Sequence, residues 1–359
     1  MDGLRGLAAL YVVVFHCWLF TFRGFPGNPG PLWLGWLRYG HLAVVFFLAL
    51  SGFSLAVAPA RHGWGLGGVR RYAWRRAWRI LPPYWAALAF SVAVSRLIVA
   101  QPHAGGVVGH KSVAVYGLLL QDLAVAPVPN GAFWSIAVEA ELYLVFPLLL
   151  LIRRRLGAVA VLAGVTVPVV LLGLLSPGVS PVDKLHLLAP QLSPLFAMGL
   201  LGAGVLAAPE RVKRLPWHWF AALAGAPVVL LMVGEGLVWT VAHYFWIDLA
   251  VGPPIAMLLA AVATGRPGWL VWLLATRPLR RLGSFSYSLY LIHLPMVAVA
   301  SRFATHHAAP GVPAFWTTLG LVVPVALAGA WAFASVFEIP FQRYRSWPAL
   351  RTAVLARWR

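Results

Sequence analysis

Runs of about 20 mostly apolar residues recur along the chain, separated by short segments rich in glycine, proline and arginine. Apolar runs of about 18 residues or more, with few or no charges, are typical of helices that cross a membrane. The pattern therefore predicts an all-α, polytopic integral membrane protein with about ten transmembrane helices. They are expected at residues 4–22, 39–58, 79–99, 132–152, 157–176, 187–207, 217–236, 244–264, 285–303 and 314–337.

The segments between these runs are short, and we find no internal repeat and no soluble domain. The apolar stretch 113–125 is too short to cross a bilayer and is interpreted as a re-entrant or surface helix. The organisation expected is one transmembrane domain over residues 1–345, followed by a short basic tail over residues 346–359. The composition agrees, because 61% of the residues are hydrophobic and only 10% are charged, whereas soluble domains have about 25% charged residues.

The positive charges predict which ends of the helices face the cytoplasm. If the N-terminus lies inside, all but six of the 28 Lys and Arg residues fall in cytoplasmic segments. The positive-inside rule therefore favours ten spans with both termini cytoplasmic, as in the plasma membrane of a bacterium. The six exceptions are Arg23, Arg38, Arg96, Lys111, Lys184 and Arg302.

The net charge of +19 does not indicate nucleic-acid binding, because the basic residues flank the apolar spans and no RNA- or DNA-binding motif is present. A single cysteine, Cys17, excludes an intrachain disulfide and a cysteine-rich metal site, and we expect it to be an inert, buried thiol. No metal site is predicted.

An ionisable residue inside a membrane span is a functional candidate by default. His16 lies about 12 residues along its helix, or about 18 Å from the inner end, and Glu139 lies about 10 Å from the outer end of a helix that runs the other way. Both therefore fall in the outer half of a core about 30 Å thick. A carboxylate that orients a histidine produces a general base for an alcohol, so we predict that Glu139 pairs with His16.

The segment "VRRYAWRRAWRILPPYW" is basic and aromatic, and it leads into the third span. Arg76 and Arg79 share a helix face and could bind phosphate groups, such as those of coenzyme A. The alternative is a positively charged flank that touches lipid headgroups. In the second span, Ser51 and Gly52 allow either close helix packing or room for a thin ligand chain.

A polar stripe is expected on the ninth predicted helix, within "GSFSYSLYLIHLPM". Tyr287, Tyr290 and His293 are three residues apart and can share one face. Such a stripe faces protein or a cavity and not lipid. The sequence leaves open whether this stripe binds a substrate or contacts a neighbouring helix.

Taken together, six segments resemble motifs of the membrane-bound acyltransferase 3 family, and they occur in order over nearly the whole chain. They are "DGLRGLAALYVVVFH" with Arg5 and His16, "FFLALSGF", "RRAWRILPPYW" with Arg76 and Arg79, "WSIAVEAELYLVFP" with Trp134, Ser135, Glu139 and Tyr143, "GSFSYSLYLIH" with Tyr287 and His293, and "FEIP" with Glu338 and Pro340. The family usually has glutamine where Glu141 stands.

The resemblance implies transfer of an acyl group, usually acetyl, from acyl-CoA to a hydroxyl of a carbohydrate or glycosylated acceptor. It implies that His16 is catalytic, as a base or as a transient acyl carrier, and that Arg76 and Arg79 are essential, for binding the donor. Arg5, Trp134, Ser135, Tyr143, Tyr287 and His293 are expected to line the substrate pocket or to support it. Members that modify surface polymers often carry an extra hydrolase-like domain, which we do not expect here.

Two other classes of protein remain open at this point. A transporter or flippase for lipid-linked glycans would share the span count and the buried histidine and carboxylate, which would then relay protons. Internal repeats or broken helices in matching halves would favour a transporter, and none is found. A non-catalytic membrane scaffold would need none of the motif residues for chemistry.

Overall fold

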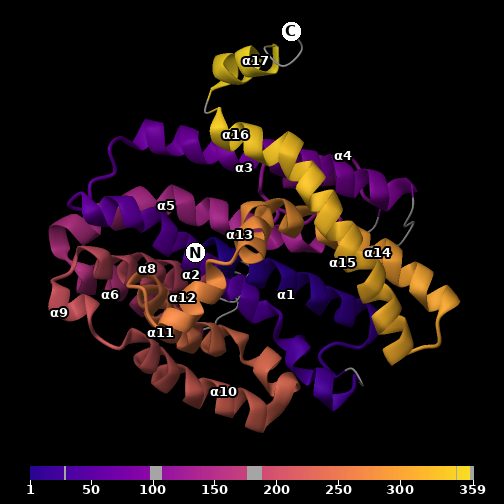
Figure 1. Ribbon diagram of the computed structural model, residues 1–359, viewed down its shortest axis with the longest axis horizontal. Coiled ribbons are helices and arrows are strands. Elements are labelled where there is room, and N and C mark those ends of the chain that lie inside the picture. The colour runs from indigo at the N-terminus through magenta and orange to yellow at the C-terminus, as the bar shows by residue number, and fades with distance from the viewer. Residues whose placement is uncertain (28–29, 98–106, 176–187, 345, 356–359) are drawn as a thin grey trace.

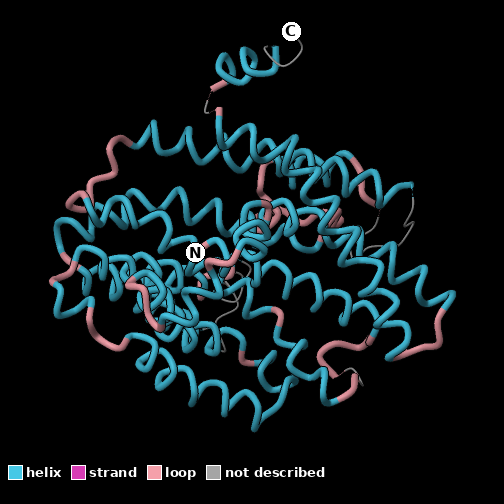
Figure 2. Tube along the Cα trace, viewed as in Figure 1, coloured by secondary structure: helices cyan, strands magenta, loops and turns pink. Residues whose placement is uncertain are grey.

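The computed structural model describes residues 1–27, 30–97, 107–175, 188–344 and 346–355, which form helices joined mostly by short connections (Figures 1 and 2). No strand occurs in these ranges, so the prediction of an all-α fold is confirmed for them. Lys184, the end of the predicted span 79–99 and the start of the predicted span 187–207 lie outside the described residues.

A helix occupies each of the ten predicted spans. The long helices are α1 (Asp2–Thr21), α2 (His41–Arg61), α3 (Val69–Leu97), α5 (Trp134–Leu156), α6 (Ala158–Leu175), α8 (Leu192–Gly202), α10 (Trp217–Ala242), α11 (Tyr244–Ala263), α14 (Ser286–His307) and α15 (Val312–Phe333). Shorter ones are η1 (Leu32–Tyr39), α4 (His110–Gly117), η2 (Gly131–Phe133), η5 (Ala203–Ala207), α9 (Glu210–Lys213), α12 (Gly268–Leu274), α13 (Arg277–Ser284), the π-helical η6 (Ala334–Glu338), α16 (Ile339–Arg343) and α17 (Trp347–Leu355).

Fewer than ten helices are long and apolar enough to cross a membrane alone. In the described ranges seven qualify, or eight if α13 and α14, which meet at an angle of 72°, count as one span. The two other predicted spans are helical but do not qualify. One is α3, whose first half carries the arginine cluster, and the other is the short α8 with η5. The polytopic membrane fold is confirmed, with a smaller number of independent spans than predicted.

The apolar stretch predicted as re-entrant or surface forms a short helix and turns. Only α4, eight residues long, is helical there, and it packs along α3. The hydroxyl of Tyr84 donates to the carbonyl of Tyr116 at 2.8 Å, and the indole N–H of Trp85 donates to the carbonyl of Gly117 at 2.9 Å. These two bonds fasten α4 to the side of α3.

Two groups of buried apolar side chains hold the bundle together. The first lies among α1, α3, α14 and α15, around the fully buried Trp18, Tyr84 and Phe315, and the second lies among α2, α5 and α8, around Phe53 and Phe196. Helices α14 and α15 lie side by side, as do α10 and α11 (Figure 1). Because lipid tails are as apolar as these side chains, apolar burial alone does not drive the helices together in a membrane, and close packing must specify these contacts.

The basic residues of several helices gather at one end of the bundle. There Arg153, at the end of α5, lies with its guanidinium 4.3 Å from the ring of Trp64, just past the end of α2. The N-terminus of α1 lies at this end too, held against the end of α12 by a close contact of Gly3 with Leu274 and against α13 by one of Gly6 with Gly283. We call this the arginine end of the bundle.

Candidate active site

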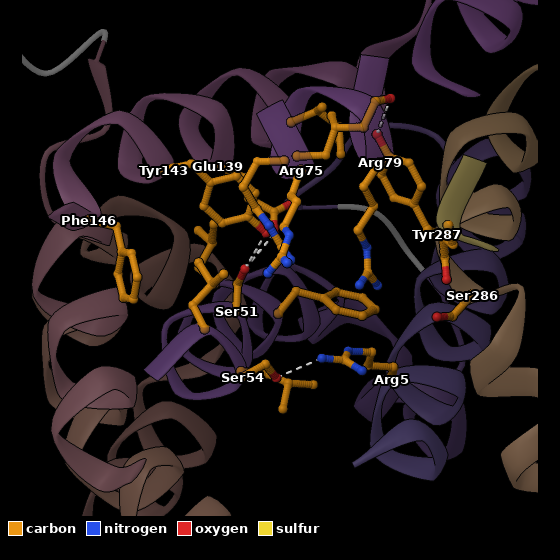
Figure 3. Close-up of a pocket in the computed structure, with 18 of the residues that line it drawn as sticks. Arg5, Ser51, Ser54, Arg75, Arg79, Glu139, Tyr143, Phe146, Ser286 and Tyr287 are labelled. Carbon is orange, nitrogen blue, oxygen red and sulfur yellow. Dashed lines mark hydrogen bonds between the residues drawn. The ribbon is translucent and has the colours of Figure 1, made fainter. Parts of the chain in front are cut away.

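A cavity of about 810 Å³ opens at the arginine end, where the two groups of buried side chains meet (Figure 3). Its walls come from α1, α2, α3, α5, α13, α14 and the segment η6–α16. The structure brings together most of the predicted site residues on these walls. They are Arg5, Ser51, Arg76, Arg79, Ser135, Glu139, Tyr143 and Tyr287.

Arginines dominate the charge of the cavity. Five line it, against three carboxylates: Arg5, Arg71, Arg75, Arg76 and Arg79 against Asp2, Glu139 and Glu338. Figure 3 shows Arg5, Arg75 and Arg79 directed into the same space from α1 and α3. The Nε atom of Arg76 is buried and has no hydrogen-bond partner among the described residues. A buried guanidinium with an unused donor is suited to a phosphate oxygen.

Arg5 is anchored on both sides at the base of the cavity. Its Nη1 donates to Asp2 Oδ1 at 3.0 Å, and its Nη2 donates to the hydroxyl of Ser54 at 2.6 Å. Ser54, on α2, was not predicted as a site residue. Its position three residues after Ser51 places both hydroxyls on neighbouring parts of one helix face, which is the signal that could have identified it.

Glu139 is the centre of a compact group of hydrogen bonds between α2 and α5. Its Oε1 accepts from Ser51 at 2.6 Å and from Tyr143 at 2.5 Å, and the two hydroxyl oxygens lie 2.6 Å apart. An ionised carboxylate only accepts, so both hydroxyl protons point to it. This group fixes one wall of the cavity (Figure 3).

The predicted pairing of Glu139 with His16 is wrong in this structure. No hydrogen bond joins the two residues, and His16 instead contacts His293 of α14, whose Nε2 lies 3.1 Å from Nδ1 of His16. The prediction rested on equal depth in the membrane, and depth fixes only one coordinate of a side chain. The position of each helix and its rotation about its own axis fix the other two coordinates, and in α1 this rotation directs His16 toward α14.

Hydrogen bonds determine which nitrogen of each histidine carries the proton. His293 Nδ1 lies 2.7 Å from the carbonyl oxygen of Tyr290, and His16 Nδ1 lies 2.8 Å from that of Val12. Carbonyl oxygens only accept, so both Nδ1 atoms are protonated. A neutral His293 then has a free lone pair on Nε2, which accepts from the Nδ1–H of His16. The Nε2 atom of His16 is left unprotonated and has no hydrogen-bond partner among the described residues.

The two histidines differ in access. His293 is fully buried, whereas His16 is partly exposed. Neither lines the cavity, which ends beside them at Tyr290. The Tyr290 hydroxyl shares a hydrogen bond of 2.6 Å with Ser135, and its ring lies 5.7 Å from that of His293. Tyr290 therefore separates the arginine-lined space from the histidine pair by the thickness of one side chain.

The start of α14 is held by Glu338, the glutamate of the last predicted motif. Its Oε2 accepts from the backbone N–H of Ser288 at 3.1 Å and from the hydroxyl of Ser288 at 2.5 Å, while Oε1 accepts from Gln342 at 2.8 Å. The carboxylate thus binds an N–H in the first turn of α14 that has no partner within the helix. This contact fixes the helix that carries Tyr287, Tyr290 and His293.

Besides the two histidines, two more of the predicted site residues do not line the cavity. Gly52 does not line the cavity, because it faces α8, where a Cβ atom would overlap the carbonyl oxygen of Phe196. Of the two roles considered for Gly52, close helix packing is the one observed. Trp134 also lies outside the cavity and stacks on His41, with ring centroids 6.2 Å apart. His41 lies within the predicted span 39–58 and could have been noticed as another ionisable residue there.

Comparisons with known proteins agree with this geometry. Residues 1–335 match the model of the acyltransferase domain family Acyl_transf_3. The chain belongs to this family. The resemblance of its motifs predicted this family. No group of three or more metal-binding side chains occurs in the part of the chain that the structure describes.

Three curated bacterial relatives share 26% identity with the chain. They are a putative peptidoglycan O-acetyltransferase, YrhL, of Bacillus subtilis, a putative membrane-bound transacylase, BcsY, of Komagataeibacter xylinus, and the acyltransferase MdmB of Streptomyces mycarofaciens. The alignments cover 91%, 84% and 84% of this chain. They cover 52% of YrhL, 73% of BcsY and 79% of MdmB, so the chain spans about half the length of the first relative. No solved structure matches the chain.

Proposed function

We propose that the protein transfers an acyl group, preferably acetyl, from acyl-CoA to a hydroxyl of a carbohydrate or glycosylated acceptor. The acyltransferase family supports the reaction class, and the relative from Bacillus subtilis is named as an O-acetyltransferase of peptidoglycan. We place the protein in the inner membrane of a bacterium, with its arginine end toward the cytoplasm, where acyl-CoA is found.

The donor occupies the arginine-lined cavity. Coenzyme A carries several phosphate groups, and guanidinium groups bind phosphate oxygens through paired N–H donors. Arg76 and Arg79 bind these phosphates together with Arg71 and Arg75, and the pantetheine arm extends past Ser51 toward Tyr290. The thioester then reaches the closed end of the cavity, beside His16 and His293.

His16 acts as the base in the transfer. Its unprotonated Nε2 takes the proton of the acceptor hydroxyl, and the oxygen attacks the carbonyl carbon of the thioester. The carbon–sulfur bond breaks, and the departing thiolate takes that proton from His16, so the products are an ester and free coenzyme A. His293 holds His16 in the required tautomer by accepting its Nδ1–H, which is a positioning role. Direct transfer requires no covalent acyl-histidine.

The observation that carries this proposal is an arginine-lined cavity with a histidine pair just behind its wall. Phosphate-binding groups alone would fit a lipid contact, and a histidine pair alone would fit helix packing. The arginines line a single space of about 810 Å³, within the range of sites for organic ligands. Tyr290, which also lines this space, lies between it and His293.

Replacement of His16 tests the base. The His16→Ala protein, expressed to the level of wild type, should give less than about one hundredth of the wild-type ester-linked acetate on the envelope glycans of the host. The matched control is His62→Ala, because Nδ1 of His62 also bonds the carbonyl four residues back at 2.8 Å but lies at the surface. Wild-type activity in the His16→Ala protein would refute the assignment.

Replacement of the arginine pair tests the donor site. Hydrogen bonds to charged groups contribute about 1.5–3 kcal/mol each, so Arg76→Gln with Arg79→Gln should raise the KM for acetyl-CoA at least 10-fold. The control is Arg70→Gln, an exposed arginine of the same helix that does not line the cavity. The proposed donor role would be abandoned if the double variant kept the wild-type KM.

A further inference from the structure

A second ionisable pair lies at the far end of the bundle from the arginines and takes no part in the mechanism above. Nε2 of His41, the first residue of α2, lies 2.8 and 3.0 Å from the two carboxylate oxygens of Asp248 on α11. The Asp248 side chain is fully buried, whereas the His41 side chain is 17% exposed. An ionisable pair inside a membrane protein is a functional candidate by default.

The pair has one open acceptor. Asp248 accepts through both oxygens, so Nε2 of His41 carries a proton and Nδ1 of the neutral ring has a free lone pair. Nδ1 has no hydrogen-bond partner among the described residues. If the pair served only to join α2 to α11, the contact of His41 Nε2 with the Asp248 carboxylate would be enough. The open Nδ1 can accept a hydrogen bond from a hydroxyl group.

Two aromatic side chains lie beside the ring of His41. It stacks on Tyr244, with centroids 4.1 Å apart, and on Trp134, with centroids 6.2 Å apart. The hydroxyl of Tyr244 is buried and has no partner among the described residues. Tyr39 and Tyr11 are near enough to interact electrostatically with Tyr244. Flat apolar faces next to phenol, imidazole and carboxylate groups are the chemistry that binds a sugar ring and its hydroxyls.

The pair also lies beside the proposed catalytic base. Gly40, the residue before His41, packs directly on the ring of Phe15, the residue before His16, so the start of α2 lies against the part of α1 that carries His16. Val44, one turn after His41, lines the arginine-lined cavity, whereas His41 does not. A group bound at His41 would therefore lie one helical turn from the wall of the proposed donor cavity.

We propose that His41, Asp248, Tyr244 and Trp134 form the binding subsite for the carbohydrate acceptor. A pyranose ring lies against the aromatic faces, and one of its hydroxyls donates to Nδ1 of His41, which positions a neighbouring hydroxyl for His16. His41 binds and orients the acceptor and does not take its proton. This assignment rests on the proposed function, because it identifies the acceptor side of the same reaction.

Binding of a soluble glycan tests the subsite without turnover. The probe is chitotetraose, four linked N-acetylglucosamine units, added to the full-length protein in detergent and followed by saturation-transfer NMR. We expect saturation transfer to the sugar with wild type and at least a 5-fold weaker affinity with Asp248→Asn, His41→Gln and Tyr244→Phe. Tyr244→Phe removes only a hydroxyl, so it keeps the test valid if Asp248→Asn does not fold.

The controls separate this inference from the proposed function. His307→Gln removes a histidine that stacks on Phe303 at 4.1 Å, without a carboxylate partner, and should bind the sugar as wild type does. Binding of radiolabelled acetyl-CoA should be unchanged in all four variants. Absence of sugar binding by wild type, or equal binding by wild type and Tyr244→Phe, would overturn the subsite. If the wild-type protein bound the sugar but did not turn over acetyl-CoA, the acyl-transfer mechanism would be overturned instead.

Discussion

In the proposed mechanism, His293 does not touch the substrate but holds His16, which does. Its Nδ1 is committed to the carbonyl of Tyr290, so its Nε2 can only accept while the ring is neutral. That acceptor shares the Nδ1–H of His16 with the carbonyl of Val12, and Nε2 of His16 stays free. Full burial of His293 removes competing water from this hydrogen bond, which strengthens it.

Substitution of His293 should therefore affect the chemical step and not donor binding. His293→Leu removes the acceptor, and we expect kcat to fall about 100-fold with the KM for acetyl-CoA unchanged. His293→Gln keeps a carbonyl oxygen that can accept from His16 and should retain at least 10 times more activity than the leucine variant. Steady-state assays of coenzyme A release would check this. Equal losses in both variants would show that His293 only fills space.

The kinds of residue at the site were predictable from the sequence, but their pairing was not. His16, Glu139, Arg76 and Arg79 were identified because charge inside or beside an apolar run is rare and costly. Which side chains meet depends on helix rotation, and a single sequence does not contain that information. Glu139 therefore proved to bind Ser51 and Tyr143, and His16 to contact His293.

Asp122, in the segment between α4 and η2, gives the fold a pH dependence outside the spans. Burial, and then the nearby Glu141, raise the pKa of Asp122 from 3.8 to about 6. The protonated form therefore favours the folded state. The contribution of Asp122 to the free energy of unfolding is therefore greatest below about pH 4 and falls as the pH rises through 6. It falls because the folded protein must then ionise a carboxyl group that the unfolded chain ionises more easily.

Asp122→Asn should remove this penalty. In detergent, its thermal midpoint should exceed that of wild type at pH 7.5, and the difference should shrink steadily as the pH falls from 6 toward 4. The matched control is Glu235→Gln, which neutralises an exposed carboxylate and should shift the midpoint little at any pH. A wild-type midpoint that rose between pH 5 and 7 relative to Asp122→Asn would contradict the sign.

At the scale of the elements, the local apolar pattern of the sequence predicted the helices but not the points at which they bend or break. A 20-residue apolar run needs a helix to satisfy its backbone inside a membrane, so the ten helical stretches could be identified. The sharp bend before α14 and the π-helical turn at η6 arise from contacts between distant segments. Glu338 of η6 binds the start of α14, 50 residues away in the chain. A local sequence pattern does not predict a contact between residues so far apart.

The contact of α2 with α8 gives a direct test at this scale. Gly52 and Gly199 face each other's helix backbone, where a Cβ atom would overlap the carbonyl oxygen of Phe196 or Ala49. Gly52→Ala should therefore cost about 1–3 kcal/mol of stability, because the helices must separate. Gly320→Ala on α15 is the matched control, since its Cβ would meet nothing within 4 Å. Thermal unfolding in detergent should show a clear loss for Gly52→Ala only, and equal midpoints would contradict this packing role.

For the whole molecule, the arginine-lined cavity is a product of assembly. Its walls come from helices at both ends of the chain, α1 and the segment η6–α16 included. The motifs predicted a phosphate-binding group and a base, but the position of the arginine-lined space next to the histidine pair depends on how the two groups of buried side chains meet. A ligand that fills this space bridges both groups, so it should stabilise the entire bundle and not one helix.

Coenzyme A without an acyl group should show this stabilisation. At about 100 times its dissociation constant, it should raise the free energy of unfolding by about 2.7 kcal/mol, provided that it binds only the folded protein. Pantetheine lacks the phosphates that the arginines bind and should stabilise far less at the same concentration. Thermal midpoints in detergent would measure both, with Arg76→Gln plus Arg79→Gln expected to abolish the advantage of coenzyme A and Arg70→Gln expected to preserve it. If pantetheine stabilised the protein as much as coenzyme A, the arginines would not be the phosphate-binding groups. Apolar side chains of the cavity would then have to provide the binding.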